Sequence, residues 1–483
     1  MTALCVQHTI PAESWSPDGD LRWLLLIPHV LGIIFSLHAL MRHHTPQGTI
    51  AWILGLNLIP CITLPLYLAL GAERIRRSVS ERLPEESVAT ILAPLRPYLT
   101  LPQPSSPVHT LSRACGYLPC NGNSVQLLCD GLETYGELIE AIRSAKESIL
   151  IEFFIIRNDR VGTTLRRLLE ERARQGIRVC VIYDEIGSHK LPGGYLRSLK
   201  AAGVHTASFN GRRFWWSSFL RINYRNHRKL VIIDSTRAYL GSLNIGLEYV
   251  RLPGKTYWRD TFAELNGPIV GQCLLSFAED WKRAVGEDIS HLTKTLQPCG
   301  DTCCQLLPSG PDDAPLNTWQ LTLLELAQEA KERLWLASPY FAPDEAVRTA
   351  LLAAALRGVD VCILIPRRGD SLMAHLAMLA HLPDMVSHGI RFMAYEPGFL
   401  HEKLALADRN LCSIGTANLD ERSLRLNFEL TLLVEHKGTA DRVEQLLCRD
   451  LQHASPLTLT DWTQLSLGTQ LAAHFCRLLS PVL

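Results

Sequence analysis

The stretch Asn226-His-Arg-Lys-Leu-Val-Ile-Ile-Asp234 decides the fold of this chain, and Gly241-Ser-Leu-Asn244 follows it closely. The apolar run Leu-Val-Ile-Ile predicts a buried strand that ends at the aspartate. His227 and Lys229 stand two positions apart at the start of this strand, so strand alternation puts both side chains on one side of the backbone. The stretch therefore predicts a strand that carries a histidine and a lysine toward the same pocket.

A second copy of the pattern lies downstream, at His401-Glu-Lys-Leu-Ala-Leu-Ala-Asp408, followed by Gly415-Thr-Ala-Asn418. Each histidine, lysine, aspartate, glycine and asparagine of this copy follows its counterpart at one constant offset of 174 positions (401 minus 227). One such motif arises readily by chance, whereas two copies with the same tail at the same distance do not. The repeat predicts two related halves, each contributing one histidine and one lysine.

The paired motifs resemble those of the phospholipase D superfamily, and their surroundings are similar to its bacterial cardiolipin synthase branch. The resemblance implies two phospholipase D-like domains that are related by a pseudo-two-fold axis, with both motifs at their interface. It also implies transfer of a phosphatidyl group through a phosphohistidine. The stretches that carry the resemblance are Glu152-Phe-Phe-Ile, Asn223-Tyr-Arg-Asn-His227, Asn244-Ile-Gly, Trp258-Arg-Asp260, Ser338-Pro-Tyr-Phe, Gly415-Thr-Ala-Asn-Leu-Asp420 and Leu426-Asn-Phe-Glu429.

Composition narrows the other possibilities. The 483 residues suffice for two to four domains. Lys+Arg and Asp+Glu both total 48, so no net charge draws the whole chain to nucleic acid or to an anionic membrane, and any attraction has to come from local patches. Fourteen cysteines in so long a chain form no disulfide framework and suit a reducing compartment. The cysteines at 115, 120, 299, 303 and 304 lack a second ligand pair at zinc spacing, so we expect no structural metal.

Two long apolar runs near the N-terminus predict transmembrane helices at about 21–40 and 49–71, which together form a hairpin over 21–72. The tail 1–20 lacks the basic start of a secretory signal. Four arginines follow the second run, while Arg42 is the one arginine in the loop, so the positive-inside rule places the catalytic body in the cytoplasm. We expect a multi-pass protein of a bacterial inner membrane, with a buried hairpin of a soluble domain as the alternative. The four arginines are Arg74, Arg76, Arg77 and Arg82.

The rest of the chain predicts an α/β fold in two halves. Proline-rich residues 73–120 predict a linker, and the prolines and glycines of 285–315 indicate a boundary. We therefore expect two α/β/α domains with mixed sheets at 121–295 and 296–483, with a helical tail from residue 461 packed on the body. The alternating strands and helices are predicted at 148–156, 163–174 and 177–183, and again at 334–339, 346–356, 359–365 and 391–395.

The paired histidines suit phosphoryl transfer. A neutral imidazole can attack a phosphodiester phosphorus, and a protonated one opposite can donate to the leaving alkoxide. Spacing does not decide between them, but the resemblance favours His227 as the nucleophile and His401 as the acid. We expect the lysines to neutralise the phosphate, so no metal or other cofactor is expected. The expected donors to the phosphate oxygens are Lys229, Lys403, Asn244, Asn418, Ser242 and Thr416.

Each histidine also needs an acceptor for its second ring nitrogen. The resemblance implies an acidic residue in this role, and we assign Asp260 to His227 and Glu429 to His401. These assignments follow chain order within each half.

Three further acidic residues belong to the motifs. Asp234 and Asp408 complete the two catalytic sets, but they follow the strands, so we expect them to anchor turns rather than to react. Glu402 occupies the variable position of the second motif, and strand alternation predicts that it points away from the pocket.

The resemblance implies transfer of a phosphatidyl group from one phosphatidylglycerol to another with release of glycerol, at a bilayer and without nucleic acid. Water as the acceptor would make the protein a lipid hydrolase, and phosphatidylethanolamine could replace phosphatidylglycerol. A superfamily nuclease is opposed by the hairpin and by the lack of a basic stripe. An inactive membrane scaffold is opposed by the intact motifs. Residues 212–221 combine arginines with aromatic residues and predict an interfacial loop that admits lipid, with plain core packing as the alternative; the oligomeric state stays open.

Overall fold

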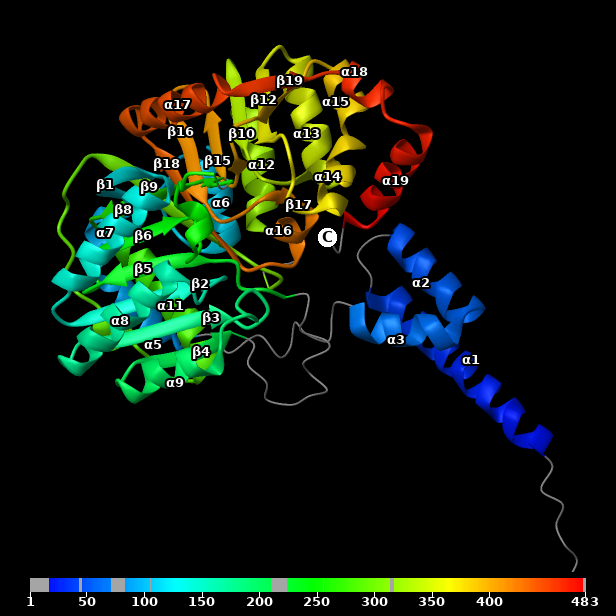
Figure 1. Ribbon diagram of the computed structural model, residues 1–483, viewed down its shortest axis with the longest axis horizontal. Helices are drawn as coiled ribbons and strands as arrows, with labels where there is room; N and C mark the ends of the chain where they lie inside the picture. The colour runs from blue at the N-terminus through cyan, green and yellow to red at the C-terminus, as the bar shows by residue number, and fades with distance from the viewer. Residues whose placement is uncertain are drawn as a thin grey trace, which may run out of the picture. The chain divides into compact units, whose positions relative to one another are not determined.

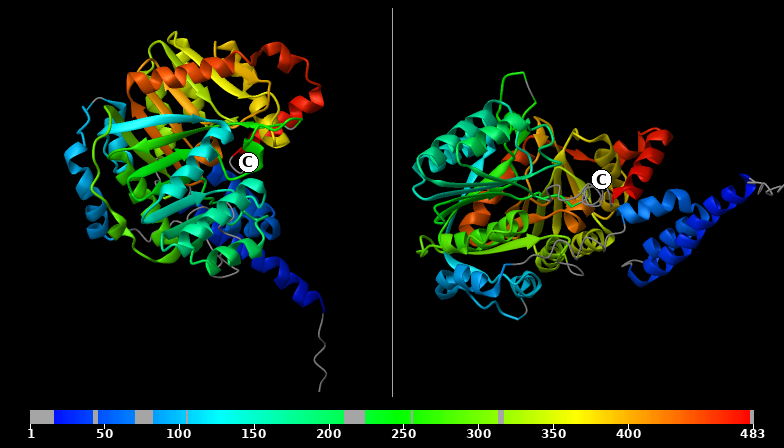
Figure 2. Two further views of the ribbon diagram at one scale, coloured as in Figure 1. Left: turned by 60° about the vertical axis from the view of Figure 1, so that its left-hand side comes forward. Right: turned by 90° about the horizontal axis from the view of Figure 1, so that it is seen from below.

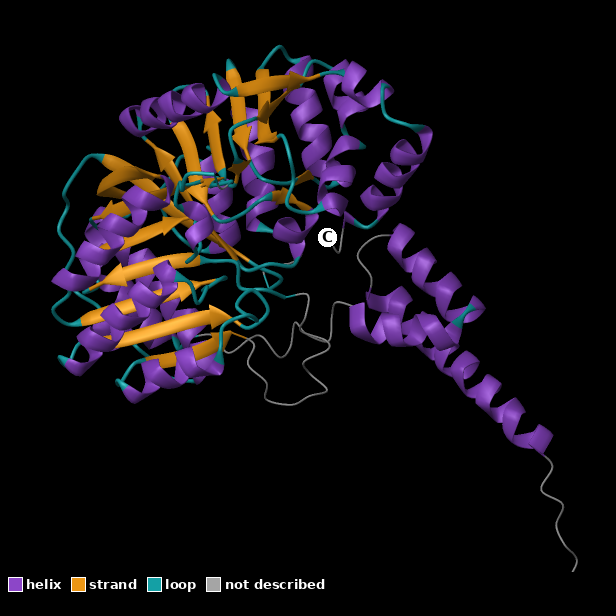
Figure 3. Cartoon of the chain, in the orientation of Figure 1, coloured by secondary structure: helices purple, strands orange, loops and turns teal. Residues whose placement is uncertain are grey.

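The computed structural model describes residues 17–42, 46–70, 83–104, 106–209, 224–254, 256–312 and 317–480. It divides the chain into an N-terminal unit, Met1–Arg77, and a body, Ser78–Leu483. The described part of the unit is helical, whereas the body combines strands and helices (Figures 1 and 3). Residues 212–221, for which we predict an interfacial loop, lie outside the described residues.

The described helices of the N-terminal unit are α1 (Pro17–Arg42), α2 (Pro46–Leu58) and α3 (Pro60–Leu70). The ring centroids of Trp52 and Tyr67 lie 5.1 Å apart, although a straight helix would separate these residues by about 22 Å. The chain therefore folds back at Pro60, which has no N–H to continue the ladder of α2. The prediction of one continuous helix over 49–71 is wrong.

Polar and small residues hold the three helices of this unit together. A Cβ atom on Gly32 of α1 would lie only 2.1 Å from the carbonyl oxygen of Leu56, so glycine allows the close approach of α2. Asn57 Nδ2 donates to Ser36 Oγ (2.8 Å), and His38 Nδ1 lies 2.7 Å from Tyr67 Oη. In the parts of the chain that the structure describes, we find no helix that is both long and apolar enough to span a bilayer.

Residues 83–120, part of the predicted linker, are folded onto the body. They form α5 (Glu85–Leu92), η1 (Ala93–Tyr98) and α6 (Pro107–Cys115), with α5 against α11 and α6 against α12. Pro84, Pro94 and Pro107 lie at the starts of these helices, where a proline loses no helical hydrogen bond, and Pro97 lies inside η1. The prediction of a linker over this stretch is therefore wrong.

A 15-stranded sheet runs through the whole body in the order β19-β13-β12-β10-β15-β16-β18-β9-β1-β8-β6-β5-β2-β3-β4. Parallel and antiparallel pairs are mixed, as predicted. Its strands are β1 (Cys120–Cys129), β2 (Ser148–Phe153), β3 (Arg178–Asp184), β4 (His205–Phe209), β5 (Lys229–Ile233), β6 (Arg237–Gly241), β8 (Thr261–Asn266), β9 (Thr302–Ser309), β10 (Arg333–Ala337), β12 (Asp360–Pro366), β13 (Arg391–Tyr395), β15 (Leu404–Ala407), β16 (Leu411–Gly415), β18 (Glu429–Glu435) and β19 (Ala454–Leu457).

The strand order repeats across the middle of the sheet. Toward the middle of the sheet, β4-β3-β2-β5-β6-β8-β1 of the first half corresponds to β13-β12-β10-β15-β16-β18-β9 of the second, and β19 adds an edge strand beside β13. The two halves meet where β1 pairs with β9, and β5 and β15 occupy matching places. Figure 1 shows the first half in cyan and green beside the second in yellow and red. The repeat predicted from the two motifs is therefore visible in the sheet.

Helices cover both faces of this sheet (Figure 2). Apolar side chains fill the space between sheet and helices in one large cluster for each half, around residues such as Ile151 and Tyr249 in the first and Ile363 and Phe392 in the second. The remaining helices are α7 (Asp130–Ser144), α8 (Arg160–Arg174), α9 (Gly193–Ala201), η2 (Leu247–Tyr249), α11 (Ile269–Val285), η3 (Ser290–Leu292), α12 (Thr318–Glu329), α13 (Glu345–Leu356), α14 (Leu372–Leu379), α15 (Leu382–Ser387), α16 (Glu421–Arg425), α17 (Lys437–Leu451), α18 (Leu459–Thr463) and α19 (Leu467–Leu478).

Two short strand pairs link distant parts of the chain near the sheet. β11 (Phe341–Ala342) pairs with β17 (Leu419–Asp420), and β14 (Phe399–Leu400) pairs with β7 (Trp258–Arg259), both in parallel. The second pair joins the two halves immediately before His401 and Asp260. It therefore fixes where the second motif lies relative to the first half.

Candidate active site

The segments that carry the two histidines cross from one half to the other. The His227 N–H donates to the Phe428 carbonyl (2.9 Å), and the His401 N–H donates to the Arg259 carbonyl (2.7 Å). Both acceptors are the residue directly before an acid of the opposite half. This backbone pairing decides which acid each imidazole can reach.

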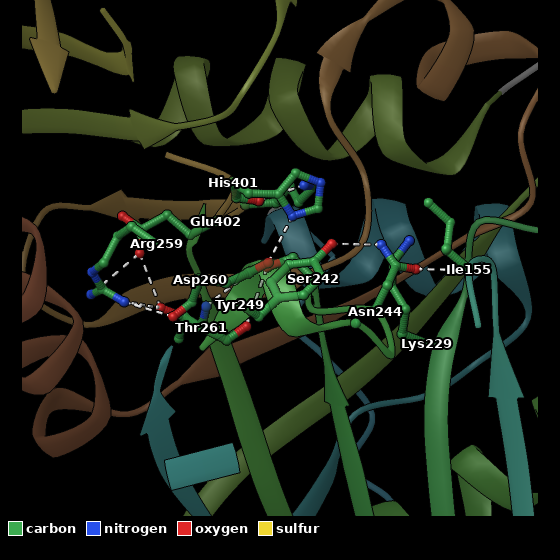
Figure 4. Close-up of polar contacts among 12 residues, drawn as sticks. Ile155, Lys229, Ser242, Asn244, Tyr249, Arg259, Asp260, Thr261, His401 and Glu402 are labelled. Atoms are coloured by element: carbon green, nitrogen blue, oxygen red, sulfur yellow. Dashed lines mark hydrogen bonds and ion pairs between the residues drawn. The ribbon is translucent and has the colours of Figure 1, made fainter. Parts of the chain in front are cut away.

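Each imidazole pairs with the acid of the other half. His227 Nδ1 lies 2.8 Å from Glu429 Oε2. His401 Nδ1 lies 2.7 Å from Asp260 Oδ2, the pair shown in Figure 4. The predicted assignment of Asp260 to His227 and of Glu429 to His401 is therefore wrong. It followed chain order, whereas the parallel pairing of β7 with β14 and of Asn226 with Phe428 exchanges the partners.

Hydroxyl groups fix the two carboxylates. Ser242 Oγ donates to Asp260 Oδ1, and Thr416 Oγ1 donates to Glu429 Oε2 (2.6 Å). We predicted that Ser242 and Thr416 donate to the phosphate, but the structure directs both hydroxyls to the orienting acids. Ser423 Oγ also donates to Glu429, at 2.8 Å. The carboxylates are thus held in one orientation before any substrate binds.

The two lysines lie next to their histidines, as strand alternation predicts. Lys229 and Lys403 are buried, and each ammonium donates to the carbonyl of the histidine two residues before it, with 2.6 Å between Lys229 Nζ and the His227 oxygen. Burial lowers the pKa of Lys229 well below its usual value and that of Lys403 to about 8. An anion bound in this site would raise the pKa of both lysines and favour their charged forms.

The pKa values of both histidines are low. Burial lowers the pKa of His227 to about 4 against the opposing effect of Glu429, and burial together with the Lys403 charge lowers that of His401 to about 3. The lysine of the other half also lowers the pKa of each histidine, in agreement with all four groups belonging to one site. Without substrate both imidazoles are neutral near pH 7. Either is therefore competent as a nucleophile.

The two asparagines have different surroundings. Asn244 Oδ1 accepts from the Ile155 N–H (3.1 Å), and its Nδ2 donates to Tyr249 Oη (2.9 Å) (Figure 4). Within the described part of the body, the buried Oδ1 of Asn418 has no hydrogen-bond partner. The two asparagines that we predicted as equivalent donors to the phosphate therefore differ in their hydrogen bonding.

The aspartates of the motifs anchor backbone turns. Asp234 accepts from the N–H groups of residues 146, 147 and 148 at 2.7–2.9 Å, and Asp408 accepts from those of 331, 332 and 333 at 2.8–3.2 Å. Both adopt positive φ, +50° and +51°, a conformation that aspartate tolerates better than most residues. These contacts agree with a turn-anchoring role and join the end of β5 or β15 to the start of the neighbouring strand.

The variable position of each motif carries a buried ionisable side chain whose printed contacts lie away from the histidines. Arg228 donates to Asp280, and Glu402 accepts from Thr261 Oγ1 (3.0 Å) and lies 3.5 Å from Arg259 Nη2. The predicted outward direction of Glu402 is consistent with these contacts. Burial raises the pKa of Glu402 to about 8, with Arg259 opposing the shift.

Aromatic rings surround one histidine far more than the other. The His401 ring lies 5.0 Å from Trp258, 5.7 Å from Tyr249 and 6.0 Å from Phe399, whereas Phe154, at 5.0 Å, is the ring recorded beside His227 among the described residues. Sequence reasoning did not assign these rings to the site. The repeat could have revealed them, because it aligns the residues beside one histidine with those beside the other.

Applying the offset of the repeat shows the same difference in the sequence. Phe399 corresponds to Arg225, and Trp258 corresponds to Asn427 when Asp260 is aligned with Glu429. The two halves of the site are therefore related in backbone but differ in chemistry. Two of the ring positions beside His401 are thus occupied by polar residues, Arg225 and Asn427, in the half of the site that carries His227.

The structure offers no candidate metal centre within its described ranges, since no three His, Cys, Asp or Glu side chains gather in a suitable group. The cysteines at 115, 120, 299, 303 and 304 are free thiols.

Comparison with known proteins defines the class first. A family model described as "Cardiolipin synthase, PLD-like domain" matches residues 138–256 and 323–451. A phosphatidylserine synthase structure from Haemophilus influenzae aligns with a TM-score of 0.61 at 14% identity, covering 78% of this chain and all of the other, which shows the shared phospholipase D-like fold.

The particular family follows from closer relatives. Proteins named cardiolipin synthase A from Pseudomonas putida (strain W619) and Pseudomonas entomophila (strain L48) are each 41% identical over 471 residues, which is 95% of this chain and 98% of theirs. The chain belongs to the cardiolipin synthase family of the phospholipase D superfamily and is a phosphatidyltransferase. The family resemblance seen in the motifs is confirmed.

Proposed function

We propose that this chain transfers the phosphatidyl group of one phosphatidylglycerol to a headgroup hydroxyl of a second, forming cardiolipin and releasing glycerol. The observation that carries the proposal is the pair of buried histidine–carboxylate contacts, each built from both halves, beside two buried lysines. The names of the relatives supply the substrate class.

In the first step His227 Nε2 attacks the phosphorus, and the bond from phosphorus to the glycerol oxygen breaks. The electron pair of that bond goes to the glycerol oxygen, which takes a proton from His401. His401 acquires this proton when the anionic phosphate binds, because a nearby negative charge raises an imidazole pKa. Lys229 and Lys403 neutralise the non-bridging oxygens as charge develops on them.

In the second step the hydroxyl of another phosphatidylglycerol gives its proton to His401 and attacks the phosphohistidine. The new phosphorus–oxygen bond forms as the bond to His227 Nε2 breaks, which restores the free enzyme. Glu429 keeps His227 in the tautomer with its lone pair on Nε2. Asp260 does the same for His401 and stabilises it when it is protonated.

The aromatic wall supports the choice of His401 as the acid and base. The leaving glycerol and the entering glycerol headgroup both have to lie next to that histidine. Trp258 and Phe399 offer flat apolar surfaces on which the carbon face of a glycerol can rest. The polar side near His227 suits the charged phosphatidyl group.

The test is an assay of the purified full chain in mixed micelles with labelled phosphatidylglycerol and a metal chelator. We expect cardiolipin and free glycerol in equal amounts, and loss of both with His227→Ala and with His401→Ala. The matched control is His205→Ala, since this exposed histidine lies on β4 at the sheet edge. Phosphatidic acid as the sole product would make the chain a hydrolase, and activity that survives both substitutions would refute the mechanism.

Two variants of the same assay distinguish the remaining alternatives. Added phosphatidylethanolamine that yields cardiolipin with free ethanolamine would identify a second donor. Cleavage of an oligonucleotide would favour a superfamily nuclease.

We also propose that the N-terminal unit anchors the chain in a membrane. Large apolar side chains of α1 and α2 face outward, with Ile33 and Leu37 of α1 56% and 61% exposed and Leu58 of α2 73% exposed. The polar pair Ser36 and Asn57 is turned toward the neighbouring helix. Apolar outside and polar inside is the arrangement that lipid favours.

Replacing Ile33 and Leu37 together by aspartate should move the protein into the supernatant after alkaline extraction of bacterial membranes. Retention in the pellet would contradict the anchor. A bacterial inner membrane with the catalytic body on the cytoplasmic side remains our proposal. It rests on the basic run 74–82, which lies outside the described residues. The domain bounds 121–295 and 296–483 are likewise proposed, because the sheet is continuous across them.

A further inference from the structure

Most of the exposed large apolar side chains that the structure describes in the body gather on two adjacent helices. Those elsewhere are scattered, such as Leu132 on α7 and Leu356 on α13. Scattered exposure of this kind is normal for proteins, whereas a contiguous patch indicates a binding surface. The exposed side chains of the patch are Leu372 (73%) and Met373 (42%) on α14, and Leu467 (72%), Leu471 (61%), Phe475 (62%) and Leu478 (76%) on α19.

The spacing on α19 puts the four side chains in one stripe. Steps of four, four and three residues keep them on a single side of a helix with 3.6 residues per turn. The opposite side of α19 is fixed to the body, because Ala473 and Cys476 are buried and Cys476 packs with Ala377 of α14. The predicted packing of the C-terminal tail is confirmed for this inner side. Within the described part of the body, no element covers the outer stripe.

The patch adjoins the candidate active site. Asp370, two residues before Leu372, accepts hydrogen bonds from Tyr340 Oη at 2.8 and 2.9 Å. The Tyr340 ring lies 6.4 Å from the Phe399 ring, which in turn lies 6.0 Å from the His401 ring, so the segment that leads into α14 is at the rim of the site. Figure 1 shows α14 and α19 side by side at one end of the body.

Basic residues border the patch. Arg367 and Arg368 are exposed in the loop that leads to α14, and Arg477 is exposed on α19 beside the stripe. An apolar stripe flanked by arginines is complementary to an anionic lipid surface, in which the side chains enter the acyl boundary and the guanidinium groups meet phosphates.

We infer that the outer faces of α14 and α19 form an interfacial surface that seats the body on a bilayer containing phosphatidylglycerol, with the active-site rim against the lipid headgroups. The inference rests on the proposed function and adds to it the surface by which the site reaches its substrate. A substrate then passes over Leu372 and Met373 toward Lys403 without leaving the bilayer completely.

The test compares two substrates with one full-chain variant, Leu471→Asp/Phe475→Asp. One substrate is long-chain phosphatidylglycerol in vesicles that contain the reconstituted protein, and the other is dihexanoyl phosphatidylglycerol below its critical micelle concentration. We expect the variant to lose about tenfold or more of its vesicle activity and to keep its activity on the soluble substrate within about twofold. Leu356→Asp, the same change at an exposed leucine outside the patch, should alter neither activity.

Equal activity of variant and wild type on vesicles would overturn the inference while leaving the proposed function intact. Equal loss on both substrates would also overturn it, because the patch would then support the fold. A change of oligomeric state in the variant, measured by light scattering in detergent, would show that a second copy covers the patch and would equally refute it. Failure of the proposed function is distinguishable, because wild-type protein would then convert neither substrate.

Discussion

Glu429 and Asp260 act on histidines that belong to the other half of the chain. Each carboxylate is fully buried and is held by a hydroxyl and by its imidazole. Burial alone would raise the pKa of both acids, but the facing histidine and lysine lower them, so both stay ionised. Their charge can therefore support an imidazolium during the reaction.

Substituting the two acids should separate the two roles. Glu429→Gln should leave His227 poorly oriented and lower kcat by about 10²–10⁴-fold, which is the range that a positioned acid or base typically contributes to catalysis. Asp260→Asn should give a similar loss, together with a changed alkaline limb in the pH profile of kcat, because His401 carries the proton. Rapid-quench trapping of the phosphohistidine provides the second readout. Glu429→Gln should reduce its formation, and Asp260→Asn should reduce both its formation and its turnover; normal formation in Glu429→Gln would contradict the crossed assignment.

The two histidines should make the folded protein sensitive to acid. The unfolded chain binds a proton on each histidine near pH 6.5, whereas folded His227 and His401 do so only at about 4 and 3. Between these values the unfolded state holds more protons, so the free energy of unfolding rises with pH and is lost as pH falls from about 6.5 to 4. Denaturant midpoints measured in detergent at several pH values should show this slope.

The double variant His227→Gln/His401→Gln should flatten that slope without abolishing it, since Glu429 and Asp260 titrate in the same direction at lower pH. An unchanged slope would show that other groups cause the acid sensitivity.

The sequence predicted which histidines and lysines meet, because strand alternation and the repeat are local signals. It could not predict the partner acids, because that pairing depends on the contact between β7 and β14, which lie about 140 residues apart (399 minus 258).

At the scale of elements, the strands and helices with clear periodicity lie where the sequence predicts them. β5, β3 and β13 and helices α8 and α13 begin and end within a few residues of their predicted bounds. The errors fall on proline-containing segments. Proline at the first turn begins α6 and α3, so a count of prolines predicts a linker or a kink where the structure has a new helix.

Removing the turn anchors should reduce stability more than catalysis. Asp234→Ala leaves three backbone N–H groups at the start of β2 without their acceptor, and should lower the free energy of unfolding by about 2 kcal/mol. Activity per folded molecule should change less than about threefold, in contrast to the histidine variants. Chemical denaturation with active-site titration measures both quantities. Asp408→Ala provides the matched case in the second half, and a hundredfold loss of activity in a stable variant would assign the aspartates to the chemistry.

At the scale of the whole molecule, a buried charge network joins the halves beside the site. Arg259 of the first half donates to Asp450 of the second at 3.0 and 2.9 Å, and also contacts Asp130 and Glu402. Asp450 is itself buried, and Arg259 is its ion-pair partner. The network thus supports the junction on which the crossed acid pairs depend.

Opposite outcomes are expected for two members of this network. Arg259→Met should cost about 3–5 kcal/mol, since it leaves a buried carboxylate unpaired. Glu402→Gln should have little effect near pH 5 and should stabilise the protein relative to wild type as pH rises toward 8. The sign follows from the raised pKa of Glu402, about 8, because the folded wild type then binds more protons than the unfolded chain between about 4.5 and 8. Thermal unfolding at pH 5 and pH 8.5 measures both, and a loss of stability in Glu402→Gln at pH 8.5 would contradict the assignment.

The exchange of acids between the halves also affects how members of this family should be recognised as active. A chain with two complete HxKxxxxD motifs can still be inactive if the acid that orients one of its histidines is missing. The motif that holds His227 does not include Glu429, which lies more than two hundred residues later in the sequence. Genome annotation that considers each motif separately would classify such a chain as active. Checking each histidine together with the acid of the opposite half would distinguish active members of the family from inactive ones.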